Sequence, residues 1–216
     1  MFRTTGLSAL FASLALFPST AARAGDDDVQ FWATLAASGN VADDATALLD
    51  ISNRFRDDRR GGHQIFLRGT VDYRPVEWIS IGGGLSYVDA DGPGEVRPHE
   101  QVTLYSGPFA LRSRLEERFI DGAPRPALRL RERLQFTQPI GSATRLSLMS
   151  EVFVGIQATT TAGQTGIEAW RNSVQLQRKI GNHVDLSLTY LVIDSFTDGK
   201  PDRLSHIPQV TLAYKF

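Results

Sequence analysis

The chain contains no cysteine among its 216 residues, so neither a disulfide framework nor a lipid-modified cysteine can be part of its design. Long hydrophobic runs are also lacking: after residue 24, no stretch reaches the roughly 20 apolar residues that a membrane-spanning helix needs. Neither sign of charge dominates, because 23 Lys and Arg residues face 24 Asp and Glu residues, and this balance argues against a nucleic-acid partner. Hydrogen-bonded sheet must therefore hold the chain together, and in a membrane that sheet has to close into a barrel.

The first 24 residues have the pattern of a secretory signal peptide. Arg3 supplies a positive charge, residues 7–17 are apolar, and Ala22-Arg23-Ala24 forms a small-x-small cleavage site before Gly25. A transmembrane anchor is the alternative, but the apolar stretch is too short for one. We therefore predict a cleaved signal peptide over residues 1–24, a mature domain over residues 25–216, and export through the periplasm.

The mature chain alternates apolar and polar residues in eleven segments separated by turn signals, as antiparallel strands do. No linker, break in composition or helical period interrupts them, so we expect a single all-β domain. The connections alternate between short turns, such as residues 106–109, and longer polar loops, such as residues 90–98 and 195–204. This sorting of loops by length is typical of bacterial outer-membrane barrels. The predicted strands cover residues 29–37, 45–56, 63–74, 77–89, 99–106, 110–120, 126–138, 144–156, 168–180, 183–194 and 205–216.

Several of these strands have one apolar and one polar face. A soluble protein turns the apolar face inward and a barrel in lipid turns it outward, and the sequence of one strand does not distinguish the two. Aromatic residues favour the membrane interpretation, because they fall at both strand ends as two interfacial girdles would. At one end these residues are Tyr73, Phe136, Tyr214 and Phe216, and at the other they are Tyr87, Phe119 and Trp170.

The chain ends in a strand whose last residue, Phe216, and third-from-last residue, Tyr214, are aromatic. This ending resembles the C-terminal strand by which outer-membrane β-barrels present themselves to the barrel assembly machinery. We therefore assign Tyr214 and Phe216 as an assembly signal, and expect outer-membrane lipid and the assembly machinery as partners.

The number of strands depends on the direction in which the first segment runs. Bacterial single-chain barrels have an even number of strands with both termini on the periplasmic side. Counting back from Phe216 makes the first segment, residues 29–37, run in the wrong direction. We therefore predict a single antiparallel transmembrane β-barrel of about ten strands from residue 45, with Phe31-Trp32 in a short segment at the barrel end. Twelve strands are the alternative.

Several short motifs resemble those of an outer-membrane family known only as domain of unknown function 2490. The resemblance extends over nearly all of the mature chain and implies a barrel whose biochemical role is open. It rests on Gln30-Phe31-Trp32, Arg54, Arg97-Pro98-His99-Glu100-Gln101, residues 111–118, Arg129-Leu130-Arg131, Glu151 and Tyr214-Lys215-Phe216.

The polar faces of residues 110–156 carry an arginine-rich wall that we predict to face the lumen. Six arginines accompany two carboxylates: Arg112, Arg114, Arg118, Arg129, Arg131 and Arg133, with Glu116 and Glu151. One hypothesis is a charge-paired plug, because a barrel of eight to ten strands is barely wider than its own side chains. The other is an anion-attracting pore, since cationic rings select anions. A hairpin at residues 121–125 would place Arg118 opposite Arg129, Glu116 opposite Arg131 and Arg114 opposite Arg133, with Glu151 opposite Arg129 across the next turn.

Glu117 and Glu132 break the apolar face of the same strands. Acidic side chains facing lipid are unfavourable, although less so than the roughly 2–4 kcal/mol of a midplane Arg or Lys. Either the strands bulge there, or these carboxylates face a lipid head group or a second protomer. This face is therefore a candidate surface for oligomerisation.

Catalytic patterns are weak. Outer-membrane lipid hydrolases resemble one another in a His-x-Ser on a strand, and none of the four histidines here has that partner. His99 beside Glu100 could form a base with its orienting carboxylate, but His99 follows Pro98 at a predicted loop exit, where a solvated or lumen-rim residue is expected. Residues 82–84 are three glycines within a strand, which suit barrel curvature rather than phosphate binding. We expect neither a cofactor nor a metal. The sequence favours a non-enzymatic envelope protein that is either structural or permeable to small solutes. A lipid-modifying enzyme and a loop-mediated binding module are the alternatives.

Overall fold

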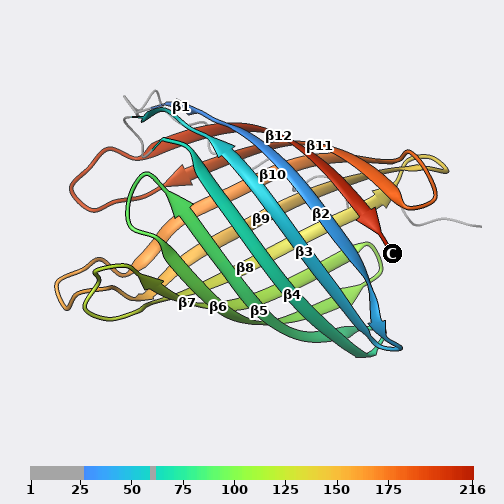
Figure 1. Ribbon diagram of the computed structural model, residues 1–216, viewed down its shortest axis with the longest axis horizontal. Helices are drawn as coiled ribbons and strands as arrows, with labels where there is room; N and C mark the ends of the chain where they lie inside the picture. Colours follow the sequence, from blue (N-terminus) through green and yellow to red (C-terminus); the bar gives the residue numbers. More distant parts are fainter. Residues whose placement is uncertain (1–26, 59–61) are drawn as a thin grey trace, which may run out of the picture.

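A computed structural model describes residues 27–58 and 62–216, so the predicted signal peptide lies outside the described residues. This part of the chain forms one closed barrel of tilted strands (Figure 1). Its strands are β1 (Asp28–Val29), β2 (Phe31–Ala42), β3 (Ala45–Phe55), β4 (Gln64–Val76), β5 (Ile79–Ala90), β6 (Glu95–Ser106), β7 (Phe109–Ile120), β8 (Ala127–Pro139), β9 (Thr144–Gln157), β10 (Gly166–Lys179), β11 (Val184–Ser195) and β12 (Arg203–Lys215).

Each strand from β2 to β12 pairs antiparallel with the next one along the chain. The barrel closes where β12 pairs in parallel with β2, from Gln209 opposite Trp32 to Lys215 opposite Ser38. The two-residue β1 continues this seam by pairing Asp28 with Ser205. Closure leaves no open sheet edge, which satisfies the backbone groups that lipid cannot. The predicted all-β, single-barrel fold is confirmed.

The expected count of about ten strands is too low, and the alternative of twelve matches the described sheet. The sheet has twelve strands, but β1 contains only two residues, so eleven long strands form the wall. The segment that we expected to tuck at the barrel end is instead the complete strand β2. In a purely antiparallel barrel with an even number of strands, the first strand would run antiparallel to the last. Here β2 runs parallel to β12, and the two strands pair in that orientation. In addition, Trp32 packs inside the barrel with Leu191 and Ile207, which fixes β2 in the wall.

The connections confirm the sorting of loops by length. Short turns lie at the end that holds the C-terminus, on the right in Figure 1, and the longer loops lie at the other end. Boundaries differ in places from those that the sequence suggests. β6 begins at Glu95, so the predicted loop of residues 90–98 shrinks to residues 91–94. Pro98 lies within that strand, paired with Leu85, and supplies no backbone N–H to it.

The barrel is apolar outside and polar inside. On β7, Leu111 is 44% exposed, whereas its neighbour Arg112 is 5% exposed and points into the lumen. The girdle aromatics also face outward at both ends, with Tyr73 52% and Trp170 47% exposed. Strand alternation therefore divides each strand between lipid-facing and lumen-facing residues, as in transmembrane barrels. Within residues 27–58 and 62–216, no helix has the length and apolarity needed to cross a bilayer.

Candidate functional site: an arginine-rich lumen

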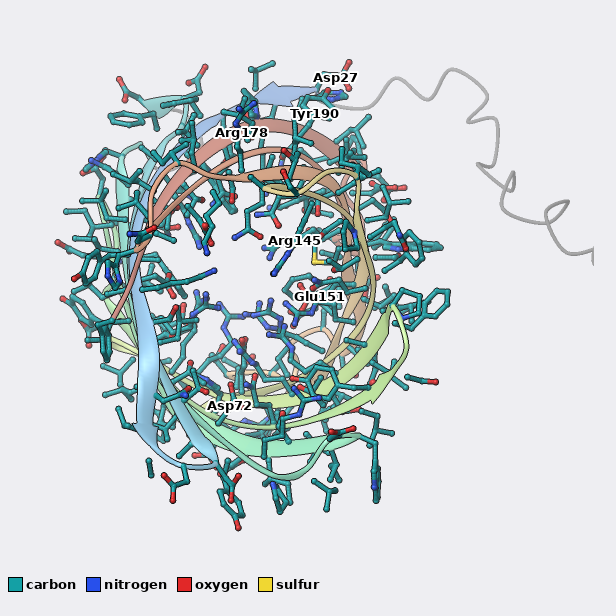
Figure 2. All side chains as sticks on the ribbon, turned by 90° about the vertical axis from the view of Figure 1, so that its right-hand side faces the viewer. Asp27, Asp72, Arg145, Glu151, Arg178 and Tyr190 are labelled. Atoms are coloured by element: carbon teal, nitrogen blue, oxygen red, sulfur yellow. The ribbon has the colours of Figure 1, made fainter. Side chains whose placement is uncertain are left out.

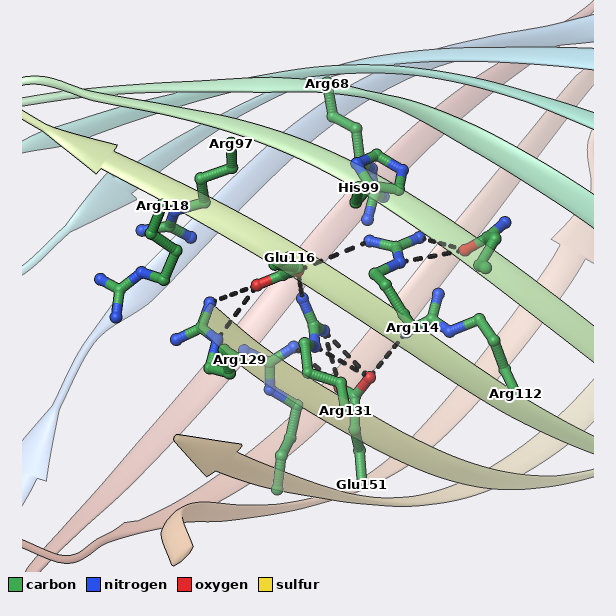
Figure 3. A network of polar contacts seen from close by, with 12 residues as sticks. Arg68, Arg97, His99, Arg112, Arg114, Glu116, Arg118, Arg129, Arg131 and Glu151 are labelled. Carbon is green, nitrogen blue, oxygen red and sulfur yellow. Dashed lines mark hydrogen bonds and ion pairs between the residues drawn. The ribbon is translucent and has the colours of Figure 1, made fainter. Parts of the chain in front are cut away.

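The predicted polar wall lies inside the barrel on β7, β8 and β9 (Figure 3). Because successive residues of a strand point to opposite faces, every second residue of these strands reaches the lumen. The inward residues are Arg112, Arg114, Glu116 and Arg118 on β7, Arg129, Arg131 and Arg133 on β8, and Glu151 on β9. The structure thus brings all eight predicted wall residues together on one side of the lumen.

The strand register differs from the predicted one. Glu116 lies opposite Arg129, Arg114 opposite Arg131 and Arg112 opposite Arg133, two residues away from the expected pairs. The reason is the loop of residues 121–126, in which Gly122 has a φ of +77° and the N–H of Ala123 bonds to the carbonyl of Ile120. Arg118 consequently pairs with Ala127. Across the next turn, Glu151 lies opposite Arg133 and not Arg129, because β8 continues to Pro139 before the chain turns.

Glu151 is the centre of one cluster of guanidinium groups. Its carboxylate is 1% exposed and accepts hydrogen bonds from Arg112 Nη2 at 2.6 Å and Arg131 Nη2 at 2.9 Å. Arg171, on β10, adds a third contact at 3.5 Å through Nη1. Such charge-assisted bonds are shorter and stronger than neutral ones, so Glu151 ties β7, β8 and β10 together through one side chain.

Glu116 is the centre of a second cluster on the same wall. Its carboxylate accepts hydrogen bonds from Arg129 Nε at 3.0 Å and from Arg131 Nη1. Arg131 therefore bridges Glu116 and Glu151, as Figure 3 shows. Arg114 instead donates from Nε and Nη2 to the Oε1 atom of Gln101, at 3.0 and 2.6 Å.

A third carboxylate, Glu95, completes the charge pattern near the end that carries the longer loops. It accepts two hydrogen bonds from Arg97, both at 2.6 Å, and one from Arg118 Nε at 2.6 Å. Sequence reasoning missed Glu95 because it lay in a predicted loop. It also missed Arg171, although the alternation of β10, which places Arg171, Ser173 and Gln175 on one face, is a signal that could have identified it.

Aromatic rings hold several guanidinium groups in place. The guanidinium of Arg54 lies 4.1 Å from the ring centre of Trp32 and 4.4 Å from that of Phe66. On the facing wall, Arg131 and Arg171 lie 4.5 and 4.9 Å from the ring centre of Phe153. Cation–π contacts at these distances stabilise a cation without neutralising its charge.

A cavity in the lumen runs beside these clusters, and its walls are strongly cationic. Figure 2 looks into the barrel and shows side chains surrounding a central space. Among the residues that the structure describes, three carboxylates line the cavity, namely Asp50, Glu95 and Glu151. Its arginines are Arg54, Arg56, Arg68, Arg97, Arg112, Arg118, Arg129, Arg131, Arg133, Arg171 and Arg203.

Several of these arginines keep unused donors. The Nε atoms of Arg54, Arg133, Arg171 and Arg203 are buried and have no hydrogen-bond partner in the described part of the chain. Beyond the end of β3, burial together with nearby Arg203 lowers the pKa of Arg56. The lumen thus combines an excess of positive charge with donors that protein acceptors leave unsatisfied, an arrangement that suits anions.

His99 and Glu100 do not form a catalytic pair. His99 is 4% exposed in the lumen wall, and its Nε2 lies 3.2 Å from Thr70 Oγ1, whereas Glu100 is exposed on the outer face. The lumen wall is tight here: a Cβ on Gly84 would lie 2.0 Å from the carbonyl oxygen of Gly69. Among the described residues, no group of three or more His, Asp or Glu side chains could hold a metal ion.

The two residues assigned as an assembly signal lie on the outer surface at the barrel end that holds the C-terminus. Tyr214 is 50% and Phe216 59% exposed. Phe216 is anchored through its backbone, because its N–H bonds to the carbonyl of Ser38 at 3.1 Å. Both aromatics are therefore held beside the parallel seam.

Comparisons with known proteins agree with this architecture. The family model described as "Protein of unknown function (DUF2490)" matches residues 29–203. An uncharacterized protein of Methylorubrum extorquens is 27% identical over 233 residues, with all of both chains covered. Among solved structures, the NanC porin in a rhombohedral crystal form is similar, with a TM-score of 0.54 at 10% identity, over 82% of this chain and 93% of that one. The last similarity shows a porin-like β-barrel fold.

Proposed function

The chain belongs to the DUF2490 family of proteins of unknown function, and we propose that it is a non-enzymatic outer-membrane channel that admits small anions. The observation that carries the proposal is the composition of the lumen cavity, where eleven arginines line the walls with three carboxylates. In a low-dielectric wall, such an excess of fixed positive charge attracts anions and repels cations. The porin-like fold supports this proposal, and so does the central space in the lumen.

The alternative is a satisfied plug, and the positions of the ion pairs weigh against it. The contacts of Glu116 and Glu151 gather on the wall formed by β7 to β10, and the cavity also extends along β2, β3, β11 and β12. The Nε atom of Arg133 is buried without a hydrogen-bond partner in the described part of the chain, although Arg133 lines the cavity. The carboxylates thus order one wall and leave charge available to a solute.

We place the channel in the outer membrane, reached through the periplasm. The apolar outer surface, the outward-facing aromatics at both ends and the porin-like fold support the membrane location. The signal-peptide pattern of residues 1–24 and the terminal Phe216 support export and barrel assembly.

Reversal potentials in planar bilayers test the channel. Under a potassium chloride gradient, we expect the wild-type channel to pass chloride in preference to potassium. Arg133→Gln should lower that preference, because one positive charge is lost from the cavity wall. Arg178→Gln is the matched control, since Arg178 is exposed on β10 and does not line the cavity. An absence of conductance in the folded wild-type protein, or equal effects of the two substitutions, would contradict the proposal.

A further inference from the structure

Five successive strands carry a polar residue in the middle of the otherwise apolar outer surface. These residues are Glu100 on β6, Ser113 on β7, Glu132 on β8, Ser150 on β9 and Asn172 on β10, and together we name them the polar stripe. Each is flanked in sequence by lumen-facing residues, so each points outward. The outward residues two positions away are apolar on both sides, for example Leu130 and Leu134 around Glu132.

The strand register makes these five residues neighbours. Ser113 lies directly opposite Glu132, and Ser150 lies directly opposite Asn172. Ser113 lies opposite Val102, two residues beyond Glu100 on β6. Likewise, Ser150 lies opposite Leu134, two residues beyond Glu132 on β8. In both cases the shift is toward the barrel end that carries the short turns. Since barrel strands tilt by roughly 35–45°, offsets in one direction bring residues of adjacent strands to similar heights. The stripe therefore follows one level across β6 to β10.

Contacts within the barrel satisfy only part of the stripe. Ser113 Oγ donates to Glu132 at 2.7 Å, and Trp170 Nε1 donates to Ser150 Oγ at 2.8 Å. The side chains of Glu100 and Asn172 have no hydrogen bond in the described part of the chain. An ionised carboxylate has room for about four hydrogen bonds, so Glu132 also keeps free acceptor sites. Facing hydrocarbon, such groups are unfavourable, and polar residues inside membranes generally face protein or water.

On the opposite side of the barrel, the described residues form no comparable stripe. There the outer surface of β2 to β5 forms an apolar groove around Leu35, Leu49, Leu67, Gly69 and Leu85. This surface suits acyl chains, which need no hydrogen bonds. A ring of subunits joined head to tail would press the polar stripe against an unlike surface, whereas a twofold dimer presses the stripe against itself.

We propose that a second copy of this chain covers the polar stripe in a twofold-symmetric dimer within the membrane. A twofold axis along the membrane normal keeps each residue at its height and reverses the order of the stripe. The Asn172 amide of one copy then donates to Glu100 of the other, and Ser113 meets Ser150. Glu132 lies nearest the axis, beside the Ser113 hydroxyl of its own copy, which donates to it. Donors thus meet acceptors along the interface. Glu117, which the sequence analysis grouped with Glu132, lies nearer the end with the longer loops and outside this interface.

Cysteine cross-linking in lipid vesicles tests the dimer, because the natural chain contains no cysteine. Leu134→Cys places a thiol beside Glu132 and keeps the stripe intact, and Leu49→Cys is the matched control on the far side of the barrel. With a short bifunctional thiol reagent, we expect a dimer band for Leu134→Cys several-fold stronger than for Leu49→Cys. Equal bands, or no dimer band for either variant, would overturn the proposal and leave lipid as the occupant.

Glu132→Leu tests the chemistry of the contact. In the Leu134→Cys background, Glu132→Leu should weaken dimer association by roughly tenfold. This is the effect expected from losing one or two hydrogen bonds in a membrane. A folded Glu132→Leu barrel that cross-links as strongly as its parent would overturn the role of the stripe. If that variant does not fold, the comparison of Leu134→Cys with Leu49→Cys decides alone. Neither result depends on conductance, so the dimer and the channel are tested separately.

Discussion

Glu151 shows how a single buried side chain can organise the lumen. Three arginines converge on a carboxylate that is 1% exposed, and Arg131 continues the contact to Glu116. Ion pairs of this kind are weak evidence for net stability, because removing charges from water costs about as much as their attraction returns. Removing one partner is different, since it leaves the remaining charges buried without compensation.

The double substitution Glu116→Gln and Glu151→Gln follows from this asymmetry. Losing the partner of a buried charge costs on the order of 3–5 kcal/mol, and less where lumen water screens the arginines. We therefore expect a lower melting temperature than for the wild-type barrel, together with stronger anion selectivity, because two negative charges leave the wall. Melting curves and reversal potentials on the same variant measure both effects. Glu77→Gln, in an exposed turn, is the control, and unchanged values in both measurements would show that the clusters neither support nor tune the lumen.

Sequence reasoning identified which wall residues face the lumen but not which ones pair. Alternation with period two was sufficient to group Arg112 with Glu116, because side-chain direction is a local property of a strand. The partner of Glu151 depends on where two strands end and on the conformation of the loop between them. A shift of two residues preserves every inward face, so the alternation contains no signal that would have corrected the register.

At the scale of elements, the last strand has two distinct roles. β12 closes the wall by pairing with both β11 and β2, and it carries the terminal aromatics. Phe216 lies against Gly39: a Cβ on this glycine would come 2.5 Å from the Phe216 ring, so Gly39 leaves space for that ring. The ring is nevertheless 59% exposed, and its contacts alone account for only part of the roughly 1.5–3 kcal/mol that a fully buried aromatic contributes.

Deleting Phe216 separates contact energy from recognition. If Phe216 is an assembly signal, its loss should reduce the amount of barrel in the outer membrane far more than the loss of another exposed girdle aromatic. Phe109→Ala is that comparison, since Phe109 is 48% exposed and packs on Phe136 with ring centres 5.3 Å apart. Quantitative blotting of outer-membrane fractions measures both variants. Similar levels for the two would identify Phe216 as an ordinary girdle residue.

At the scale of the whole molecule, closure explains why the sequence predicted the barrel but not its strand number. Alternation, loop lengths and girdle aromatics are local or nearly local features, and all of them are present in the chain. The parallel seam joins residues 32–38 to residues 209–215, and nothing in either segment specifies the direction of its partner. Because bacterial barrels usually have an even number of strands, the sequence then favoured a barrel that excludes β2. Only the complete wall shows that an eleventh long strand is needed.

The seam itself can be tested because the chain lacks cysteine. Ala36 lies opposite Ala213 in the parallel pairing of β2 with β12, so Ala36→Cys with Ala213→Cys should form a disulfide on oxidation of the folded barrel. In a ten-strand barrel β12 would pair with β3 instead, and the control variant Leu48→Cys with Ala213→Cys, whose side chains both face the lumen, would be the one that cross-links. Non-reducing gels distinguish the two after boiling, because a chain linked between these positions stays compact and migrates faster than the reduced chain. Cross-linking of the control pair alone would support the ten-strand barrel. Cross-linking of the first pair shows that β2 is part of the wall. The lumen is then wide enough for arginines on different strands to face one another across a cavity.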